Sequence, residues 1–369
     1  MTISREAQIS LLAAGSYWDI RQDRFTPTKD DSNHAPIPEG WKVLTQFDKS
    51  DSGPAAVTGF SARVYQNTAT NEIVISYAGT EFGNTSAQGT TADFLNGNGP
   101  LALGDYGSQA YRAAALYQEV KATGKTNISF TGHSLGGGLA AIMGVWFNRP
   151  AYVYAPAPFE KSVDQTQLTD KTTTVGGGLT VSFAADEVRV LPLVKAELLR
   201  KTGVVDPALA SYNPITGFSS REQNVSAWAI KGELLEKTLF VLNWIEKSPR
   251  TSLYDSSAVT LGFMEKHSID LHAAALLVPN FETQAKAVTN SLKLLMDDKL
   301  YSTNILGSQQ HIIMKLLRNE TGVRSTDGTV LKASTQMLTH FAADLGKIAS
   351  NLSGLKRKTG SGLSLSYLA

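Results

Sequence analysis

The stretch NISFTGHSLGGGL, residues 127–139, decides the fold prediction. It contains the pattern G-x-S-x-G at positions 132–136, with Ser134 at its centre. Strand-forming apolar residues precede the pattern and small residues follow it, which predicts a sharp turn between a strand and a helix. Such a turn exposes the serine hydroxyl beside the free N–H groups of the helix N-terminus, which can stabilise an oxyanion. Ser134 is therefore the predicted nucleophile of a serine hydrolase; the alternative is a glycine-rich connection without catalysis.

The segments around this turn alternate between strand and helix patterns. The pattern predicts a β-hairpin over 57–77, a helix over 106–123 ended by Gly124, a strand over 127–131, a helix over 139–147 and strands over 151–156 and 179–186. Alternating strands and helices are typical of a mostly parallel sheet with helices on both faces. We therefore predict an α/β-hydrolase fold.

The remaining segments define the predicted domain organisation. A helix is expected within 3–20, and the Gly/Asn/Thr-rich stretch 80–107 is expected to be a loop or a mobile cover. Beyond residue 207 the pattern is helical, over 226–245, 271–277 and 281–296. We predict a catalytic domain over 1–280 and a C-terminal helical extension with a flexible tail over 281–369.

Composition excludes several classes of function. The formal net charge of +1 gives no broad attraction to nucleic acid, and the absence of cysteine removes disulfides, thiolate metal sites and thiol nucleophiles. No metal-binding or phosphate-binding motif is present, so no cofactor and no metal are expected. The N-terminus lacks the features of a conventional signal peptide, and no apolar run is long enough to span a membrane.

Three stretches carry a resemblance to a known family. Gly-His-Ser-Leu-Gly-Gly at 132–137 resembles the nucleophile motif of the class 3 lipase family, IVISYAGT at 73–80 resembles its oxyanion strand, and TADFLNGNGPL at 91–101 resembles its segment after the lid. The chain departs from the family at Ala78, where an Arg is usual, and at Phe94, where a Trp is usual. The resemblance covers 55–190 and extends more thinly to about 275. Within the family, the chain looks closest to the bacterial phospholipases A1 that lack a conventional signal peptide.

The acid and the base of a catalytic triad should follow the serine in the order Ser, Asp or Glu, His. Asp186 ends the predicted strand LTVSFAAD and is the expected acid, because the tip of a sheet strand lies beside the serine turn. His267 precedes an apolar helix in MEKHSIDLH and is the expected base, with His272 as the alternative. Both segments also resemble the corresponding segments of the class 3 family. His311 and His340 lie in helical patterns and are expected to be packing residues.

An oxyanion hole needs two hydrogen-bond donors. One is the backbone N–H of Leu135, which directly follows the nucleophile. The second is expected from Thr80, which follows a buried strand and occupies the position that lines the oxyanion hole in the class 3 family. A simple strand-ending turn at Gly79-Thr80 is the alternative.

Together these features predict a lipolytic serine hydrolase that cleaves glycerophospholipids as a phospholipase A1. Triacylglycerol lipase and general carboxylesterase are the alternatives, followed by a non-catalytic scaffold; the triad alone also allows a serine peptidase or an acyltransferase. The expected partners are a lipid ester, transiently a membrane or micelle interface, and an accessory or inhibitor protein, but no nucleic acid. The expected location is extracellular, reached without a conventional signal peptide, with the cytoplasm as the alternative.

Overall fold

The computed structural model describes about half of the chain. The described residues are 3–17, 37–50, 60–79, 106–157, 159, 163, 171–175, 179–183, 190–231, 233, 251–255, 267–277, 323–324, 331–333 and the single positions 336, 339, 343 and 347. Within these ranges, no helix combines the length and apolar character needed to cross a lipid bilayer.

A mixed eight-stranded sheet forms the centre of the described structure. Its order is β11-β10-β7-β6-β5-β4-β2, and β3 pairs with β4. The neighbouring strands β5, β6, β7, β10 and β11 are parallel to one another. β4 is antiparallel to β5, β2 and β3. The bounds are β2 Trp41–Val43, β3 Lys49–Ser50, β4 Ser61–Asn67, β5 Ile73–Tyr77, β6 Ile128–His133, β7 Ala151–Tyr154, β10 Val225–Lys231 and β11 Thr251–Asp255. This is the mostly parallel α/β architecture that the sequence predicts.

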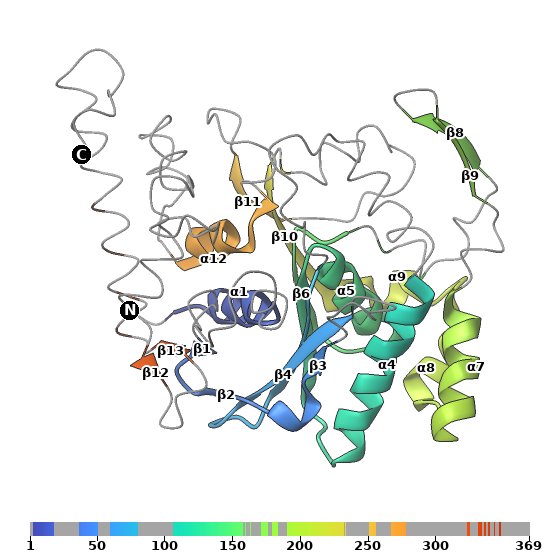
Figure 1. The fold of residues 1–369 in the computed structure, drawn as a ribbon, viewed down its shortest axis with the longest axis horizontal. Helices are drawn as coiled ribbons and strands as arrows, with labels where there is room; N and C mark the ends of the chain where they lie inside the picture. Colours follow the sequence, from blue (N-terminus) through green and yellow to red (C-terminus); the bar gives the residue numbers. More distant parts are fainter. Residues whose placement is uncertain are drawn as a thin grey trace, which may run out of the picture.

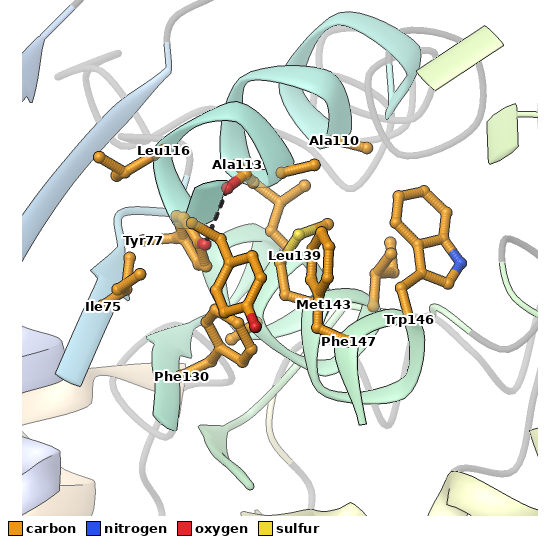
Figure 2. Close-up of a cluster of buried hydrophobic side chains, with 14 of the residues drawn as sticks. Ile75, Tyr77, Ala110, Ala113, Leu116, Phe130, Leu139, Met143, Trp146 and Phe147 are labelled. Carbon is orange, nitrogen blue, oxygen red and sulfur yellow. Dashed lines mark hydrogen bonds between the residues drawn. The ribbon is translucent and has the colours of Figure 1, made fainter. Parts of the chain in front are cut away.

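Two long helices cover one face of this sheet. α4 (Tyr106–Ala122) connects β5 to β6, and α5 (Leu135–Phe147) connects β6 to β7. Figure 2 shows the core between them, where side chains of β5 and β6 meet α4 and α5. The Tyr77 hydroxyl crosses this layer and donates to the Ala113 carbonyl at 3.2 Å. On the same side lie α7 (Val190–Thr202), α8 (Pro207–Ala210), α9 (Phe218–Arg221) and the 3-10 turn η5 (Glu222–Asn224) (Figure 1).

The opposite face is covered by elements from distant parts of the sequence. α1 (Arg5–Gly15) packs against β5, β6 and β7 and lies beside α12 (Ile269–Leu277) (Figure 1). Arg5 anchors α1 through a bidentate ion pair with the buried carboxylate of Glu72, which also accepts from the Ser129 hydroxyl at 2.9 Å. The hydrogen bonds between Arg5 and Glu72 raise the pKa of the Arg5 guanidinium above its usual range. The first helix is thereby held against the sheet next to the helix that follows His267.

Two smaller sheets complete the described elements. β8 (Lys171–Val175) and β9 (Leu179–Phe183) form an antiparallel pair, and β1 (Ile37–Pro38) pairs with β13 (Leu331–Ala333), which pairs with β12 (Val323–Arg324). A 3-10 turn, η2, spans Thr45–Phe47. The strands β12 and β13 lie within the C-terminal region that was expected to be helical. The predicted domain boundary at residue 280 stays a prediction.

Several predicted elements are confirmed, one strand lies outside the central sheet, and one predicted helix is wrong. The hairpin is β4–β5, the helix over 106–123 is α4, and Gly124 follows it with φ +84°. The predicted strand over 179–186 contains β9, but β9 pairs only with β8 among the described strands, not with the central sheet. The stretch that begins the predicted helix over 226–245 is instead β10, paired with β7 and β11. The predicted helix over 281–296 and most of the predicted loop over 80–107 lie outside the described residues.

Candidate active site

Ser134 occupies a strained turn between β6 and α5. Its backbone has φ 58° and ψ −127°, a conformation that non-glycine residues rarely adopt. β6 ends at His133 and α5 begins at Leu135, so the turn consists of Ser134 alone. The side chain is thereby presented at the N-terminus of α5, where the first N–H groups of a helix have no acceptor within the helix.

The backbone around the two glycines of the motif leaves no room for a side chain. A Cβ at Gly132 would lie 2.3 Å from the Gly136 carbonyl oxygen, and a Cβ at Gly136 would lie 2.1 Å from the Tyr77 carbonyl oxygen. Both positions are closer than any real Cβ contact, and both neighbours are backbone atoms that cannot rotate away. The absence of side chains at these positions lets β6, α5 and the end of β5 approach one another around the serine.

A chain of two hydrogen bonds joins Ser134 to a histidine and a carboxylate. The Ser134 Oγ lies 2.9 Å from His267 Nε2, and His267 Nδ1 lies 2.6 Å from Glu233 Oε2. All three residues are buried, with relative exposures of 5% for Ser134, 2% for His267 and 0% for Glu233. The structure therefore brings together two of the residues that the sequence singles out and adds a third. His272, the alternative base, instead directs Nδ1 to the Ser268 carbonyl at 2.8 Å, within its own helix region.

Glu233 owes its position to β10. This strand is the neighbour of β7 in the parallel sheet, and Glu233 follows its last residue by two positions. The Glu233 N–H donates to the Ile230 carbonyl at 3.1 Å, which turns the chain at the strand end. Carboxyl ends of neighbouring parallel strands lie at one edge of a sheet, so Glu233 and Ser134 share that edge.

The carboxylate that contacts His267 Nδ1 is not that of Asp186, the acid predicted from the sequence. The expectation required the strand before Asp186 to belong to the central sheet, whereas β9 forms a separate pair with β8. Asp186 itself lies outside the described residues, and the carboxylate on His267 Nδ1 belongs to Glu233. Glu233 was not predicted as a site residue, because the pattern over 226–245 predicts a helix. The signal that could have found it is the apolar run AWAI before a Gly-Glu pair, which also fits a buried parallel strand.

Of the two expected oxyanion donors, the structure describes Leu135 but not Thr80. Leu135 is the first residue of α5 and directly follows Ser134, so its N–H belongs to the free N-terminal set of that helix. Thr80 lies outside the described residues, but Gly79 before it is described. A Cβ at Gly79 would lie 3.0 Å from Ser134 Cβ and 2.6 Å from the His133 carbonyl oxygen. The chain segment that leads into Thr80 is therefore in contact with the nucleophile turn.

A comparison with models of protein families shows the family to which the chain belongs. The family model of the Tle-like phospholipase domain, described as phospholipase-like, matches residues 11–240, more than half of the chain. The chain belongs to the Tle-like phospholipase family. No curated protein is significantly similar to it.

The matched region contains most of the site. It includes the Ser134 turn, Glu233 and the whole central sheet up to β10, while His267 follows the matched region. Membership in the Tle-like phospholipase family makes the chain a phospholipase-type ester hydrolase with a lipid substrate. This match does not specify a class 3 lipase or a phospholipase A1.

Proposed function

We propose that this Tle-like phospholipase is a phospholipase A1 that works through the triad Ser134, His267 and Glu233. The observation that carries the proposal is the continuous hydrogen-bond chain from Ser134 Oγ through His267 to the fully buried Glu233 carboxylate. A nucleophile within hydrogen-bond distance of a base, which a third group orients, is the arrangement needed for acyl transfer.

The acylation step follows from this geometry. Glu233 accepts the Nδ1 proton of His267, which leaves Nε2 free to accept the Ser134 hydroxyl proton as the oxygen attacks the ester carbonyl. The attack forms a tetrahedral oxyanion, and the Leu135 N–H and Thr80 are the proposed donors that stabilise it. Collapse of this intermediate breaks the ester bond, and His267 returns its proton to the departing alcohol oxygen of the lysophospholipid.

Deacylation repeats this proton transfer with water as the nucleophile and Ser134 as the leaving group. The fatty acyl group is now bound to Ser134 as an ester, and His267 takes a proton from a water molecule that attacks the acyl carbon. The second oxyanion collapses, Ser134 recovers its proton from His267, and the free fatty acid leaves. Glu233 stabilises the imidazolium in both steps, because its buried carboxylate lies 2.6 Å from Nδ1.

The finer substrate assignment rests on two supports. The family match is to a phospholipase domain, and the motifs at 73–80 and 132–137 resemble those of bacterial phospholipases A1. We therefore propose cleavage at the sn-1 position of glycerophospholipids, with slower action on triacylglycerols. Secretion without a conventional signal peptide and an accessory or inhibitor protein remain proposals from the sequence.

The test uses a phospholipid that carries different labels at sn-1 and sn-2, offered below and above its aggregation threshold. We expect release of the sn-1 label by the wild type and none above background by Ser134→Ala, because loss of the nucleophile removes the acyl-enzyme route. Release from sn-2 alone, or a clear preference for triacylglycerol, would contradict the A1 assignment and leave the triad in place. A folded Ser134→Ala protein with wild-type hydrolysis would contradict the triad.

A further inference from the structure

Tyr17 and His133 form a buried hydrogen-bonded pair beside the proposed triad. The Tyr17 hydroxyl lies 2.9 Å from His133 Nδ1, and the other ring nitrogen of His133, Nε2, lies 2.5 Å from the His267 carbonyl oxygen. Tyr17 is 7% exposed and His133 is 6% exposed. Neither residue has a role in the acyl transfer described above, although His133 is the direct neighbour of the nucleophile.

The partners of His133 determine its tautomer when the ring is neutral. A carbonyl oxygen only accepts, so Nε2 must carry the proton that is donated to the His267 carbonyl. Nδ1 then has a lone pair and accepts from the Tyr17 hydroxyl. The Tyr17 hydroxyl also lies 3.4 Å from the His133 carbonyl oxygen, but the contact with Nδ1 is the shorter one.

The same tyrosine oxygen reaches the strand that leads to Thr80. The Gly79 N–H donates to the Tyr17 hydroxyl oxygen at 3.1 Å. A side chain on Gly79 would prevent this approach, because its Cβ would lie 2.5 Å from the Tyr17 oxygen. The direction of donation is therefore continuous, from Gly79 N–H to Tyr17, from Tyr17 to His133 and from His133 to the His267 carbonyl.

This relay joins three segments that come from distant parts of the sequence. Gly79 lies two residues after the end of β5 and directly before the expected oxyanion residue, His133 precedes the nucleophile, and His267 is the proposed base. Each segment contributes one group to the reaction, and acyl transfer is sensitive to errors of about 1 Å in their relative placement.

We propose that Tyr17 and His133 are positioning residues that hold the base segment and the oxyanion segment in register with Ser134. The inference rests on the proposed function, because it assigns the pair a role in that reaction. It also makes Tyr17, two residues after the end of α1, part of the active site. Arg5 and Glu72 anchor the N-terminal end of α1, and Tyr17 follows its C-terminal end. In this proposal the anchoring of α1 serves catalysis as well as packing.

The test measures the labelling rate of Ser134 by a fluorophosphonate probe together with kcat and KM for an ester substrate. We expect Tyr17→Phe to lower both the labelling rate and kcat about 10-fold with little change in KM, because misplacement affects the transition state more than substrate binding. His133→Leu, which removes both bonds, should lower them about 100-fold. His133→Gln keeps an N–H that can donate to the His267 carbonyl, so we expect it to recover most of the activity lost in His133→Leu.

Two controls separate positioning from stability. Tyr154→Phe removes a different tyrosine hydroxyl bond, in which the Tyr154 hydroxyl donates to the Glu6 carbonyl of α1 at 2.7 Å. We expect it to lower the melting temperature as much as Tyr17→Phe does, with less than about a threefold effect on labelling. In the His133→Leu background, Tyr17→Phe should cause almost no further loss of kcat, since coupled residues give non-additive effects.

The outcomes distinguish this inference from the proposed function. Wild-type labelling rates and kcat in Tyr17→Phe, or fully additive losses in the double variant, would overturn the positioning role while leaving the triad intact. An equal loss of labelling in Tyr154→Phe would also overturn it, because anchoring of α1 alone would then explain the effect. Absence of labelling in the wild type itself would overturn the proposed function, and the inference with it.

Discussion

Glu233 and Asp186 lead to opposite expectations for the same kind of substitution. The structure places Glu233 on His267 Nδ1, so Glu233→Gln should lower kcat by about 10²–10⁴ with the protein still folded, because an amide no longer stabilises the imidazolium. Asp186→Asn should leave kcat within about threefold of the wild type. Steady-state hydrolysis of a soluble ester by both purified variants measures the difference.

A control for folding and stability is needed for both variants. Circular dichroism and thermal unfolding of both variants show whether either change acts through the fold rather than through the chemistry. If Asp186→Asn were the more damaging change at equal stability, the acid would be Asp186 and the bond to Glu233 would have another purpose.

Gly136 gives a prediction about stability rather than chemistry. Gly136→Ala should destabilise the protein by about 3 kcal/mol or more, because the new Cβ would lie 2.1 Å from a backbone carbonyl. Gly137→Ala is the graded control; its Cβ would lie 3.0 Å from Pro156 Cα, and we expect a loss of about 1 kcal/mol. Urea unfolding compares the two. Equal stability of both variants would mean that the turn can widen.

The residues that the sequence predicted best are those identified by local patterns. Ser134 is identified by a five-residue motif, and its strained backbone fits that motif. His267 was chosen among several histidines by the helix that follows it, and the structure brings it to the serine. Glu233 has no local motif, because any carboxylate at the end of the correct strand can serve as the acid. Its assignment depends on knowing which strand neighbours β7.

At the scale of elements, the error concerning β10 has a physical cause. Helices and fully buried parallel strands both present runs of apolar residues, and short runs do not distinguish a period of 3.6 from one of 2. The run AWAI at 227–230 and the apolar residues after Glu233 together fit the pattern of one amphipathic helix. The hairpin β4–β5 was predicted correctly because its strands are separated by a turn, in which Asn71 has φ 56°.

The anchoring of α1 makes a second prediction at this scale. Arg5→Met should destabilise the protein by about 1–3 kcal/mol, because it leaves the buried Glu72 carboxylate without its cation. The lower part of this range allows for the partial exposure of Arg5. Adding Glu72→Gln to Arg5→Met should restore part of the loss, since the uncompensated charge is removed. Thermal unfolding of the two single variants and the double variant gives the coupling energy.

The opposite sign of coupling would contradict this interpretation. If the double variant were less stable than the sum of the two single changes, the ion pair would not determine how α1 is held. The buried contacts of Ile9, Leu12 and Ala13 would then account for most of the attachment.

Across the whole molecule, stability should be unevenly distributed. β5, β6 and β7 have hydrogen-bonded neighbours on both sides and helices on both faces, whereas β8 and β9 pair only with each other among the described strands. Isolated two-stranded pairs are only marginally stable in water. Hydrogen exchange measured by mass spectrometry should therefore show amides at 171–175 and 179–183 exchanging at least about 100-fold faster than those at 128–133. Similar protection in both segments would indicate that other parts of the chain cover the β8–β9 pair.

The strained backbone of Ser134 has an evolutionary consequence. Glycine adopts positive φ without cost, whereas alanine does not, so Ser134→Gly should be more stable than Ser134→Ala by about 1 kcal/mol, and we expect both variants to be inactive. A lineage that no longer needed the reaction would gain stability by accepting glycine here. The Ser134 hydroxyl is therefore presented from a backbone conformation that glycine would adopt with less strain.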